Sequence, residues 1–237
     1  MSYRLIYWPG LPGRGEFARL VLEESGAAYE DTAQGDRQDA LEAMKSALSG
    51  AAGGLPALAP PVLQHDALFI AQSGNICEYV AARHGLAPAD EGQRALARQL
   101  QATVADLVSE THDTHHPVAI GKYYEDQLAE ALEASAHFRE VRLPKFLGYF
   151  ERVLEQSGGE WLLGAFSYPD LALFQVVEGL KYAFPIGTGR TLEALPLLTA
   201  HAARVAARPR IAAYLASERR QTFNANGIFR AYPELDG

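Results

Sequence analysis

Residues 61–76, Pro-Val-Leu-Gln-His-Asp-Ala-Leu-Phe-Ile-Ala-Gln-Ser-Gly-Asn-Ile, contain two short apolar runs followed directly by a helix start. The runs are Pro61–Leu63 and Ala67–Ile70, and only three residues separate them. Because so short a connection joins antiparallel neighbours, we expect a β-hairpin here. A helix is expected from about Ser73 to His84, where a glycine follows as its C-terminal cap.

The residues before this hairpin extend the same pattern toward the N-terminus. Tyr3–Tyr7 has the aromatic and β-branched composition of a strand, and a run of proline and glycine over residues 9–13 ends it. Apolar residues at helical spacing predict a helix that stops at Gly26. A second strand over 28–32 and a short helix over 36–48 follow. The resulting order, β-α-β-α-β-β-α, predicts one α/β unit.

The chain changes character after Gly85. Residues 86–91 have the composition of a linker, and nearly every later segment has helical periodicity. We therefore predict an α/β domain over residues 1–86 and an all-helical domain over residues 92–237. Pro144 is expected to kink the second of these helices. The expected helices are 92–116, 125–156, 169–184, 191–206 and 209–217.

Composition limits the classes of function. The formal net charge of −8 and the lack of a Lys/Arg stripe argue against nucleic acid as a partner. No apolar run reaches the roughly 18 residues that a membrane span needs, and the N-terminal residues lack a signal-peptide pattern. The single cysteine, Cys77, suits a reducing compartment and is expected to be a packing residue. A cytoplasmic location is therefore expected.

Two groups of residues in the first domain could carry chemistry. Tyr7 lies where the first strand gives way to a glycine-rich loop, so its hydroxyl either completes the core or donates a hydrogen bond to an anion in a cleft. Gln72 and Ser73 lie at a helix start, whose unpaired N–H groups bind carboxylates, although Ser73 could equally be a simple N-cap. If the bond before Pro61 is cis, Val62 could offer its backbone groups to a peptide-like ligand.

Together these residues resemble the cytosolic glutathione transferases, and most closely the tyrosine-type group that includes the sigma, pi, mu and alpha classes. The resemblance covers essentially the whole chain. It rests on Tyr7-Trp8-Pro9, Gly13-Arg14 and Arg19-Leu20 near the start, and on Gln72-Ser73-Gly74-Asn75-Ile76 after the hairpin. A capping box at Ser167-Tyr168-Pro169-Asp170 and the tail over residues 223–236 also match. The family has a thioredoxin-like N-terminal domain and an all-α C-terminal domain.

The resemblance implies a detoxification enzyme that uses glutathione as co-substrate and takes small hydrophobic electrophiles. Tyr7 would remain protonated near pH 7 and hydrogen-bond the glutathione thiolate, which favours ionisation of the thiol. Gln72 and Ser73 would hold the γ-glutamyl carboxylate, and Val62, after Pro61, the cysteinyl backbone. A homodimer without a metal cofactor is also implied.

Some positions depart from the family pattern, chiefly where the glycyl end of glutathione is bound. Lys45 matches a lysine that contacts the glycyl carboxylate, but Leu41 replaces the usual tryptophan four residues earlier. Ala59 also replaces a common glutamine or lysine. We therefore expect one glycyl contact to be lost or replaced. Two roles are open for Arg14, which either reaches the site or braces the domain interface.

The helical domain would supply the remaining contacts. Some family members use an acid on the first long helix to reach the γ-glutamyl ammonium of the other subunit, and Glu110 and Asp113 are the candidates here, unless both are merely solvated. The candidate lining of the electrophile pocket is aromatic and apolar, which suits such a substrate. It consists of Trp8, Leu11, Tyr123 and Tyr124.

Three histidines, His112, His115 and His116, have the spacing of one helical face, which a metal site would need. No cysteine or paired carboxylate accompanies them, so the sequence favours a solvated helix end and no metal.

Other functions remain open on the same fold. A glutathione-dependent isomerase or peroxidase would use the same site, and a non-catalytic glutathione- or ligand-binding protein is possible because fold does not guarantee activity. A thioredoxin-type oxidoreductase is disfavoured because no cysteine lies between Tyr7 and Phe17.

Overall fold

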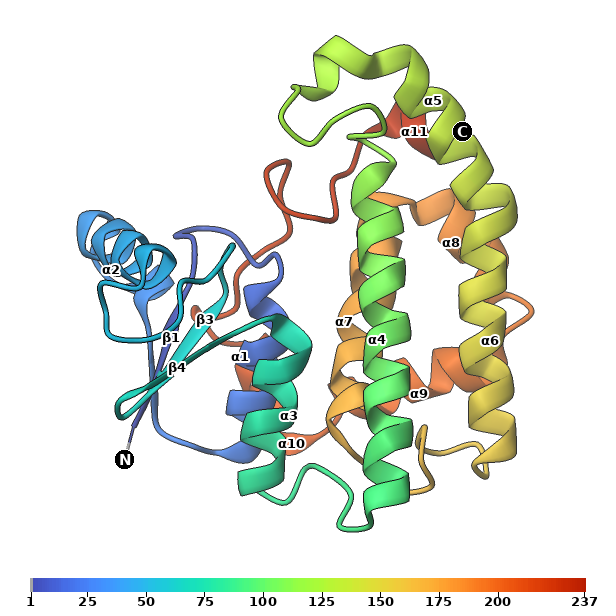
Figure 1. Cartoon of the computed structure of the whole chain (residues 1–237). Coiled ribbons are helices and arrows are strands. Elements are labelled where there is room, and N and C mark those ends of the chain that lie inside the picture. Colours follow the sequence, from blue (N-terminus) through green and yellow to red (C-terminus); the bar gives the residue numbers. More distant parts are fainter. Residues whose placement is uncertain (1) are drawn as a thin grey trace. The chain divides into compact units, whose positions relative to one another are not determined.

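The computed structural model of the chain describes residues 2–237, which are divided between two compact units (Figure 1). The first unit is Met1–Arg98 with Ala206–Thr222, and the second is Gln99–Val205 with Phe223–Gly237. The first unit thus takes in residues 206–222, which the sequence assigns to the helical domain. The domain limits 1–86 and 92–237 stay a prediction. Among the described helices, none combines the length and the apolar character that crossing a bilayer requires.

A four-stranded mixed sheet forms the centre of the first unit, in the order β2-β1-β3-β4. β1 runs parallel to β2 and antiparallel to β3, and β3 pairs antiparallel with β4, which confirms the expected hairpin. Its turn contains Asp66 at φ 54°, a left-handed conformation that aspartate tolerates. The strands are β1 (Tyr3–Ile6), β2 (Tyr29–Asp31), β3 (Val62–His65) and β4 (Leu68–Ala71).

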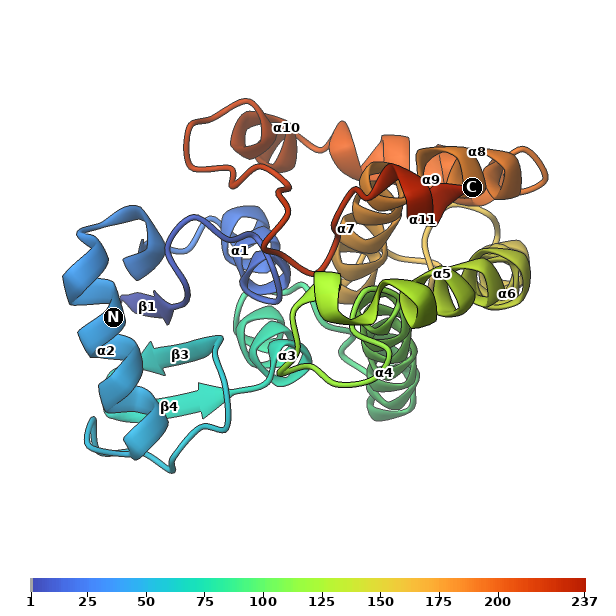
Figure 2. The same cartoon turned by 90° about the horizontal axis from the view of Figure 1, so that it is seen from above.

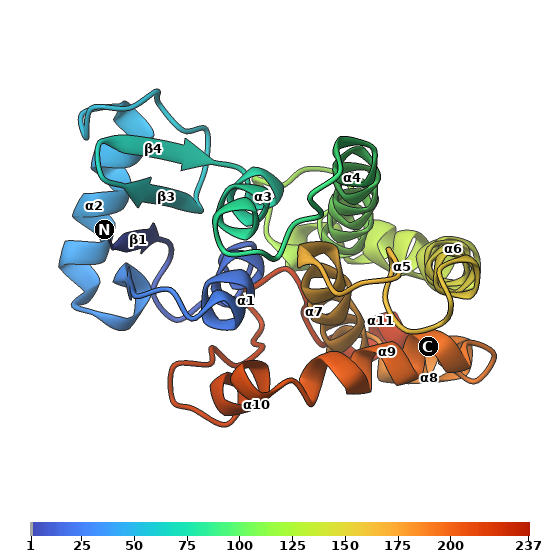
Figure 3. The same ribbon diagram turned by 90° about the horizontal axis from the view of Figure 1, so that it is seen from below.

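Helices cover both faces of this sheet, with α2 on one face and α1 and α3 on the other (Figures 1 and 2). On the α2 side, Met44 and Ala47 pack against Ile6 and Val62. Figure 3 shows α10 beside α1. The helices of this unit are α1 (Gly15–Ser25), α2 (Arg37–Ser49), α3 (Ser73–Arg83) and α10 (Pro209–Leu215), with one 3-10 turn, η1 (Thr32–Gln34).

The second unit is helical, and its core includes one almost completely buried helix, α7. The first helix of this region, α4 (Glu91–Asp113), begins in the first unit and continues into the second. The other elements are η2 (Tyr124–Gln127), α5 (Leu128–His137), η3 (Phe138–Arg142), α6 (Leu143–Gln156), α7 (Tyr168–Ala183), α8 (Pro185–Leu192), α9 (Pro196–Ala206) and α11 (Pro233–Asp236). An α/β unit followed by helices confirms the predicted fold class.

Two long helices expected from periodicity are divided in the structure. The expected helix 125–156 consists of a 3-10 turn, α5, a π turn and α6. The irregularity lies directly before Pro144, which occupies the first turn of α6. The expected helix 191–206 is interrupted after α8, and α9 begins only at Pro196.

The capping box at the start of α7 is confirmed, including its reciprocal half. The Ser167 N–H donates to Asp170 Oδ2 at 2.8 Å, and the Ser167 side chain bonds the N–H of Asp170, the third helical residue. Both residues are buried. Because the capping box is buried, it joins the start of α7 to the surrounding residues as well as capping the helix.

Candidate active site

Tyr7 follows β1 directly and lies on the backbone of the loop that leads into α1. The Arg14 N–H donates a hydrogen bond to Tyr7 Oη at 2.8 Å, and the tyrosine is only 6% exposed. A Cβ at Gly13, whose φ is +39°, would lie 2.2 Å from Tyr7 Oη. A Cβ at Gly15 would lie 2.7 Å from the tyrosine ring. Glycine at both positions therefore lets the phenol approach the loop this closely.

The surroundings of Tyr7 keep its hydroxyl protonated. Burial raises the pKa of Tyr7 above its ordinary value, and the hydrogen bond from the Arg14 N–H and the positive charge of Arg19 oppose this only partly. The Arg19 guanidinium lies 5.5 Å from the centre of the tyrosine ring. Because the Arg14 N–H occupies a lone pair of the hydroxyl oxygen, the hydroxyl keeps its own hydrogen for another acceptor. An anion near Tyr7 is the natural partner for that hydrogen.

Ser73 is the first residue of α3, and it is not the helix cap. Gln72 occupies the N-cap position at φ 71°, and its side chain makes no capping hydrogen bond. Ser73 Oγ donates instead to the Arg14 carbonyl oxygen at 3.0 Å. The alternative that Ser73 serves as a simple N-cap is therefore wrong.

One peptide segment thus links two of the expected site residues. Arg14 donates through its N–H to Tyr7 and accepts through its carbonyl from Ser73. Two backbone hydrogen bonds therefore fix the start of α3 relative to the phenol. Such a backbone link requires no particular side chain at position 14, and for this reason the sequence gives no sign of it.

The start of α3 can receive an anion. The first N–H groups of a helix have no carbonyl partner within the helix, and they carry partial positive charge. The first helical bond here runs from the Ile76 N–H to the Gln72 carbonyl at 2.9 Å. The N–H groups that precede it, at Ser73, Gly74 and Asn75, are those available to a carboxylate.

The strand that would hold the peptide part of a ligand begins after a cis bond between Pro60 and Pro61. Neither proline carries a backbone N–H, so this segment offers only carbonyl oxygens. Val62 is buried and lies opposite Ile6 in β1 and Ala71 in β4. A strand therefore flanks Val62 on each side, and a ligand contact through Val62 stays a prediction.

Residues of α2 explain part of the departure from the family pattern at the expected site for the glycyl end of glutathione. Leu41 packs against the cluster formed by Ile6, Met44 and Val62, so the position that holds tryptophan in the family contributes to the core here. Lys45 is exposed on the same helix. Arg14 is half-buried and has partners of its own, so both of its predicted roles remain open.

A buried ionic network around Arg19 supports the Tyr7 loop, and sequence reasoning did not single it out. Arg19 Nε donates to Asp31 at 2.6 Å, and Nη1 donates to Glu16 at 3.1 Å and to the carbonyls of Leu11 and Pro12. Burial alone would lower the pKa of Arg19, but the two carboxylates outweigh burial and raise it. The Arg19 guanidinium therefore fixes the backbone of the loop at Leu11 and Pro12.

The same network ties the later segment of the first unit to α1. Glu16, which is fully buried, accepts a hydrogen bond from the Tyr214 hydroxyl at 2.6 Å and pairs with Arg220. Glu24 pairs with Arg208 just before α10. These contacts join residues almost 200 positions apart, which explains why residues 206–222 fold with the first unit.

The expected electrophile-pocket residues differ in exposure, and each is described within its own unit. Trp8 is largely exposed and Leu11 is half-buried in the first unit. In the second unit Tyr123 is exposed, whereas Tyr124 is buried, stacks on Tyr232 and donates to Glu234 at 2.9 Å. Their role as a pocket lining stays a prediction.

The two candidate acids on α4 have different surroundings. Glu110 accepts two hydrogen bonds from Arg142, at 2.6 and 2.7 Å, so its carboxylate is already paired. Asp113 is exposed, and its carboxylate lies 3.8 Å from His112. Neither observation tests a contact across a dimer, which stays a prediction for both residues.

Cys77 is a packing residue, as expected. It is fully buried in α3, and burial raises the pKa of its thiol to about 12. A thiol in this environment is not a nucleophile near pH 7.

Comparison with known proteins agrees with this architecture. The family model described as "Glutathione S-transferase, C-terminal domain" matches residues 112–218. Glutathione S-transferase P 2 of Bufo bufo is 29% identical over 231 residues, which cover 95% of this chain and 99% of the toad protein. Glutathione S-transferase A3 of Mus musculus is 29% identical over 213 residues, covering 89% of this chain and 87% of the mouse protein.

A solved structure with a similar fold is prostaglandin synthase D of Nilaparvata lugens. Its TM-score is 0.73 at 20% identity, with 92% of this chain and 98% of the insect protein covered. At that identity the likeness shows the fold alone, a thioredoxin-like sheet followed by a helical domain. The two vertebrate relatives and the family model identify the family. The chain is therefore a member of the cytosolic-type glutathione S-transferases, related to the pi and alpha types.

Proposed function

We propose that this chain conjugates glutathione to small hydrophobic electrophiles, and that the Tyr7 hydroxyl donates a hydrogen bond to the glutathione thiolate. The observation that carries the proposal is the buried Tyr7, whose oxygen accepts from the Arg14 N–H while burial raises its pKa. A protonated phenol held in this way stabilises a thiolate more than a neutral thiol. The thiolate is the nucleophilic form, so this hydrogen bond favours attack.

The start of α3 is the proposed anchor for the γ-glutamyl carboxylate. Its N–H groups and the Ser73 hydroxyl are fixed to the Tyr7 loop through the Arg14 carbonyl. A tripeptide bound there would have its sulfur held near the phenol. Because the carboxylate anchor and the phenol are both hydrogen-bonded to the Arg14 backbone, the thiolate would be held in a defined orientation. Gln72, Pro61, Val62, Lys45 and Arg14 are the further glutathione contacts in this proposal.

Tyr7→Phe tests the catalytic role directly. The change removes one hydrogen bond to a charged sulfur, a contact of about 1.5–3 kcal/mol, so kcat/KM should fall roughly 10- to 100-fold. Conjugation of a chloronitrobenzene is the assay, and glutathione affinity measured by calorimetry should change little. The pH at which the rate reaches half its maximum should move upward in Tyr7→Phe because the thiol then ionises less readily. An unchanged pH profile would contradict the role proposed for Tyr7.

The same assay separates the alternative functions. Wild type that binds glutathione but gives no turnover with a broad panel of electrophiles would favour a non-catalytic binding protein. Turnover of hydroperoxides or isomerisable substrates in preference to conjugation would favour the peroxidase or isomerase alternative. Failure to bind glutathione at all would overturn the proposal.

Ser73→Ala should weaken glutathione binding more than Lys45→Ala does. Ser73 lies at the proposed γ-glutamyl anchor and bonds the Arg14 carbonyl, whereas Lys45 is exposed and has Leu41 in place of its family partner. When glutathione binds, the Ser73 hydroxyl would turn from the Arg14 carbonyl to the carboxylate, and loss of this hydrogen bond to a charged group predicts about a tenfold or greater rise in Kd for Ser73→Ala. Isothermal titration with glutathione gives both values, and thermal unfolding checks that each variant is folded. The reverse order would mean that the anchor is misplaced.

Dimerisation and a cytoplasmic location belong to the same proposal. A homodimer predicts twice the chain mass in light scattering at micromolar concentration. A monomer under those conditions would rule out a contact from Glu110 or Asp113 to the glutathione of a second subunit.

A further inference from the structure

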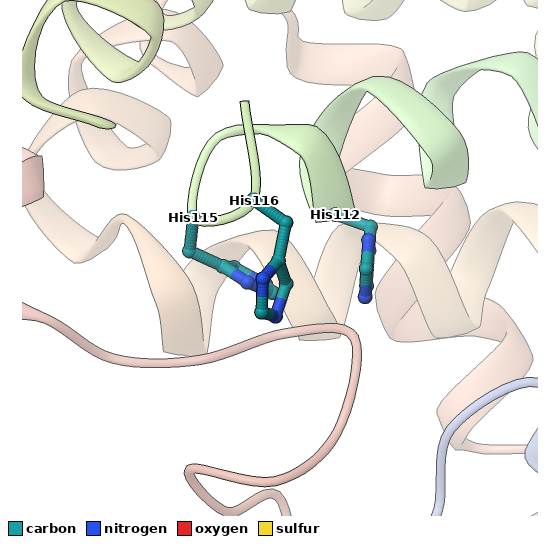
Figure 4. Close-up of side chains that lie close together, drawn as sticks. All are labelled: His112, His115 and His116. Atoms are coloured by element: carbon teal, nitrogen blue, oxygen red, sulfur yellow. The ribbon is translucent and has the colours of Figure 1, made fainter. Parts of the chain in front are cut away.

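Three histidines gather where α4 ends. His112 lies in the last turn of the helix, and His115 and His116 follow it in the next turn. The three ring centroids are 4.8 to 4.9 Å apart. Each ring offers one nitrogen as a metal ligand, and these three nitrogens lie within 4.8 Å of one another. Figure 4 shows the rings of His115 and His116 against each other, with His112 directed the same way as His116.

This cluster is not the solvated helix end that the sequence predicts. His115 is 2% exposed and His116 is 9% exposed, so the expectation was wrong for these two residues. An imidazole offers a metal the lone pair of the ring nitrogen that carries no hydrogen, so the hydrogen bonds of the two buried rings decide which nitrogen is available.

The hydrogen bonds of the two buried rings leave one nitrogen of His115 available. His115 Nε2 lies 2.9 Å from the Ile228 carbonyl oxygen, which can only accept, so Nε2 carries the hydrogen. Nδ1 then presents a lone pair, and this buried atom has no partner among residues 2–237. A buried nitrogen without a partner reduces the stability of the fold unless another group, such as a bound ion, contacts it.

The Gln127 amide nitrogen, which can only donate, lies 3.3 Å from His116 Nδ1. It also has the carbonyls of Ala119, Lys122 and Tyr123 within 3.3 Å, and these can accept both of its hydrogens and leave the His116 Nδ1 lone pair to a metal. Histidines that bind metals commonly hold the other ring N–H on a backbone carbonyl, as His115 does on Ile228.

We propose that His112, His115 and His116 bind one divalent transition-metal ion of the Zn²⁺ type, with water completing the coordination. Three imidazoles and one open position form a known zinc geometry. Bonds of about 2.0 Å in a tetrahedron bring nitrogens to about 3.3 Å from one another. One ring must therefore turn inward, and the partly exposed His112, at the helix end, is the ring we assign to this movement.

Charges near the cluster act in opposite directions. The Asp113 carboxylate lies 3.8 Å from His112 and favours a cation, whereas the positive charge of Arg230 disfavours one. Arg230 is held by the Gly227 carbonyl at 2.9 Å in the C-terminal tail. The site lies within the second unit, so its occupation does not depend on the function proposed for Tyr7.

Metal titration of the full chain tests the site. The chain should be made without a polyhistidine tag, treated with a chelator and kept free of glutathione, which itself binds metals. Zn²⁺ should then bind with one-to-one stoichiometry in calorimetry and raise the Tm. Co²⁺ in its place should give the visible absorption of a tetrahedral nitrogen site, without a thiolate band because Cys77 is buried.

Single substitutions separate this site from weak surface binding. His112→Gln and His116→Gln should each weaken Zn²⁺ binding at least about tenfold, a loss that even outer-shell partners produce. His84→Gln, which changes an exposed histidine at the end of α3, is the matched control and should leave Kd unchanged. Equal Kd values for all three variants, or no one-to-one binding by wild type, would overturn the proposal. Unfolding curves without metal show that each variant is folded.

Discussion

Arg19→Met is expected to lower the free energy of unfolding by about 3–5 kcal/mol, the usual effect of removing one partner from a buried ion pair. Arg19 is fully buried and contacts two carboxylates, at 2.6 Å from Asp31 and 3.1 Å from Glu16. Methionine keeps much of the apolar stem but leaves the buried Asp31 carboxylate without its cation, while Glu16 keeps only its pairing with Arg220. Urea unfolding followed by circular dichroism gives the free energy.

The effect should also reach the proposed active site. Arg19 Nη1 donates to the carbonyls of Leu11 and Pro12, so the loop beneath Tyr7 loses its support in Arg19→Met. We expect glutathione affinity to fall in this variant even at temperatures where it is fully folded. Replacing Asp31 by Asn in the same chain should recover part of the lost stability because it removes the carboxylate charge that Arg19 had neutralised.

Arg4→Met is the matched control for this prediction. Arg4 pairs with Glu30 at 3.0 Å at the surface, where the two side chains are 38% and 63% exposed, so its loss should change stability by less than about 1 kcal/mol. Equal effects of the two substitutions would mean that the Arg19 network contributes no more than a surface pair does.

The α/β unit could be predicted because its signals are local. The apolar runs on either side of Gln64-His65-Asp66 specify two strands, and the structure pairs them antiparallel as β3 and β4. Gly13 could be placed in a loop, but neither it nor Gly15, the first residue of α1, could be explained, since the reason for both is the Tyr7 ring packed against their backbone. Local signals give the elements, and the contact that makes a residue necessary is often distant in sequence.

The Arg19 network shows why part of the site was not predictable. Glu16 and Tyr214 are 198 residues apart, and no periodicity connects them. His115 was expected at a solvated helix end because no cysteine or paired carboxylate accompanies the three histidines, but its Nε2 bonds the carbonyl of Ile228, 113 residues later. The π turn at Phe138–Arg142 lies just before Pro144, where the sequence predicts a kink, but the sequence does not indicate its π form.

Asp170→Ala is expected to destabilise the chain by about 3–5 kcal/mol because it leaves several buried donors without an acceptor, each worth about 1–3 kcal/mol. The fully buried carboxylate accepts from the Ser167 N–H at 2.8 Å and from the Leu162 N–H at 3.0 Å. It also lies 2.9 Å from His201 Nε2, whose ring is fully buried. The loss should therefore exceed the contribution of a helix cap alone, about 1 kcal/mol.

Two comparison variants distinguish a buried junction from ordinary capping. Asp36 caps α2 with hydrogen bonds of 2.8 and 3.2 Å from Gln38 and Asp39, but it is exposed, so Asp36→Ala should lose only about 1 kcal/mol. Asp170→Asn keeps the shape and one acceptor oxygen but directs an NH₂ group at one set of donors, so its loss should be intermediate. Similar losses for Asp170→Ala and Asp36→Ala would show that the bonds to Leu162 and His201 add nothing. A larger loss for Asp170→Ala would show that this carboxylate joins α7 to the loop before it and to α9.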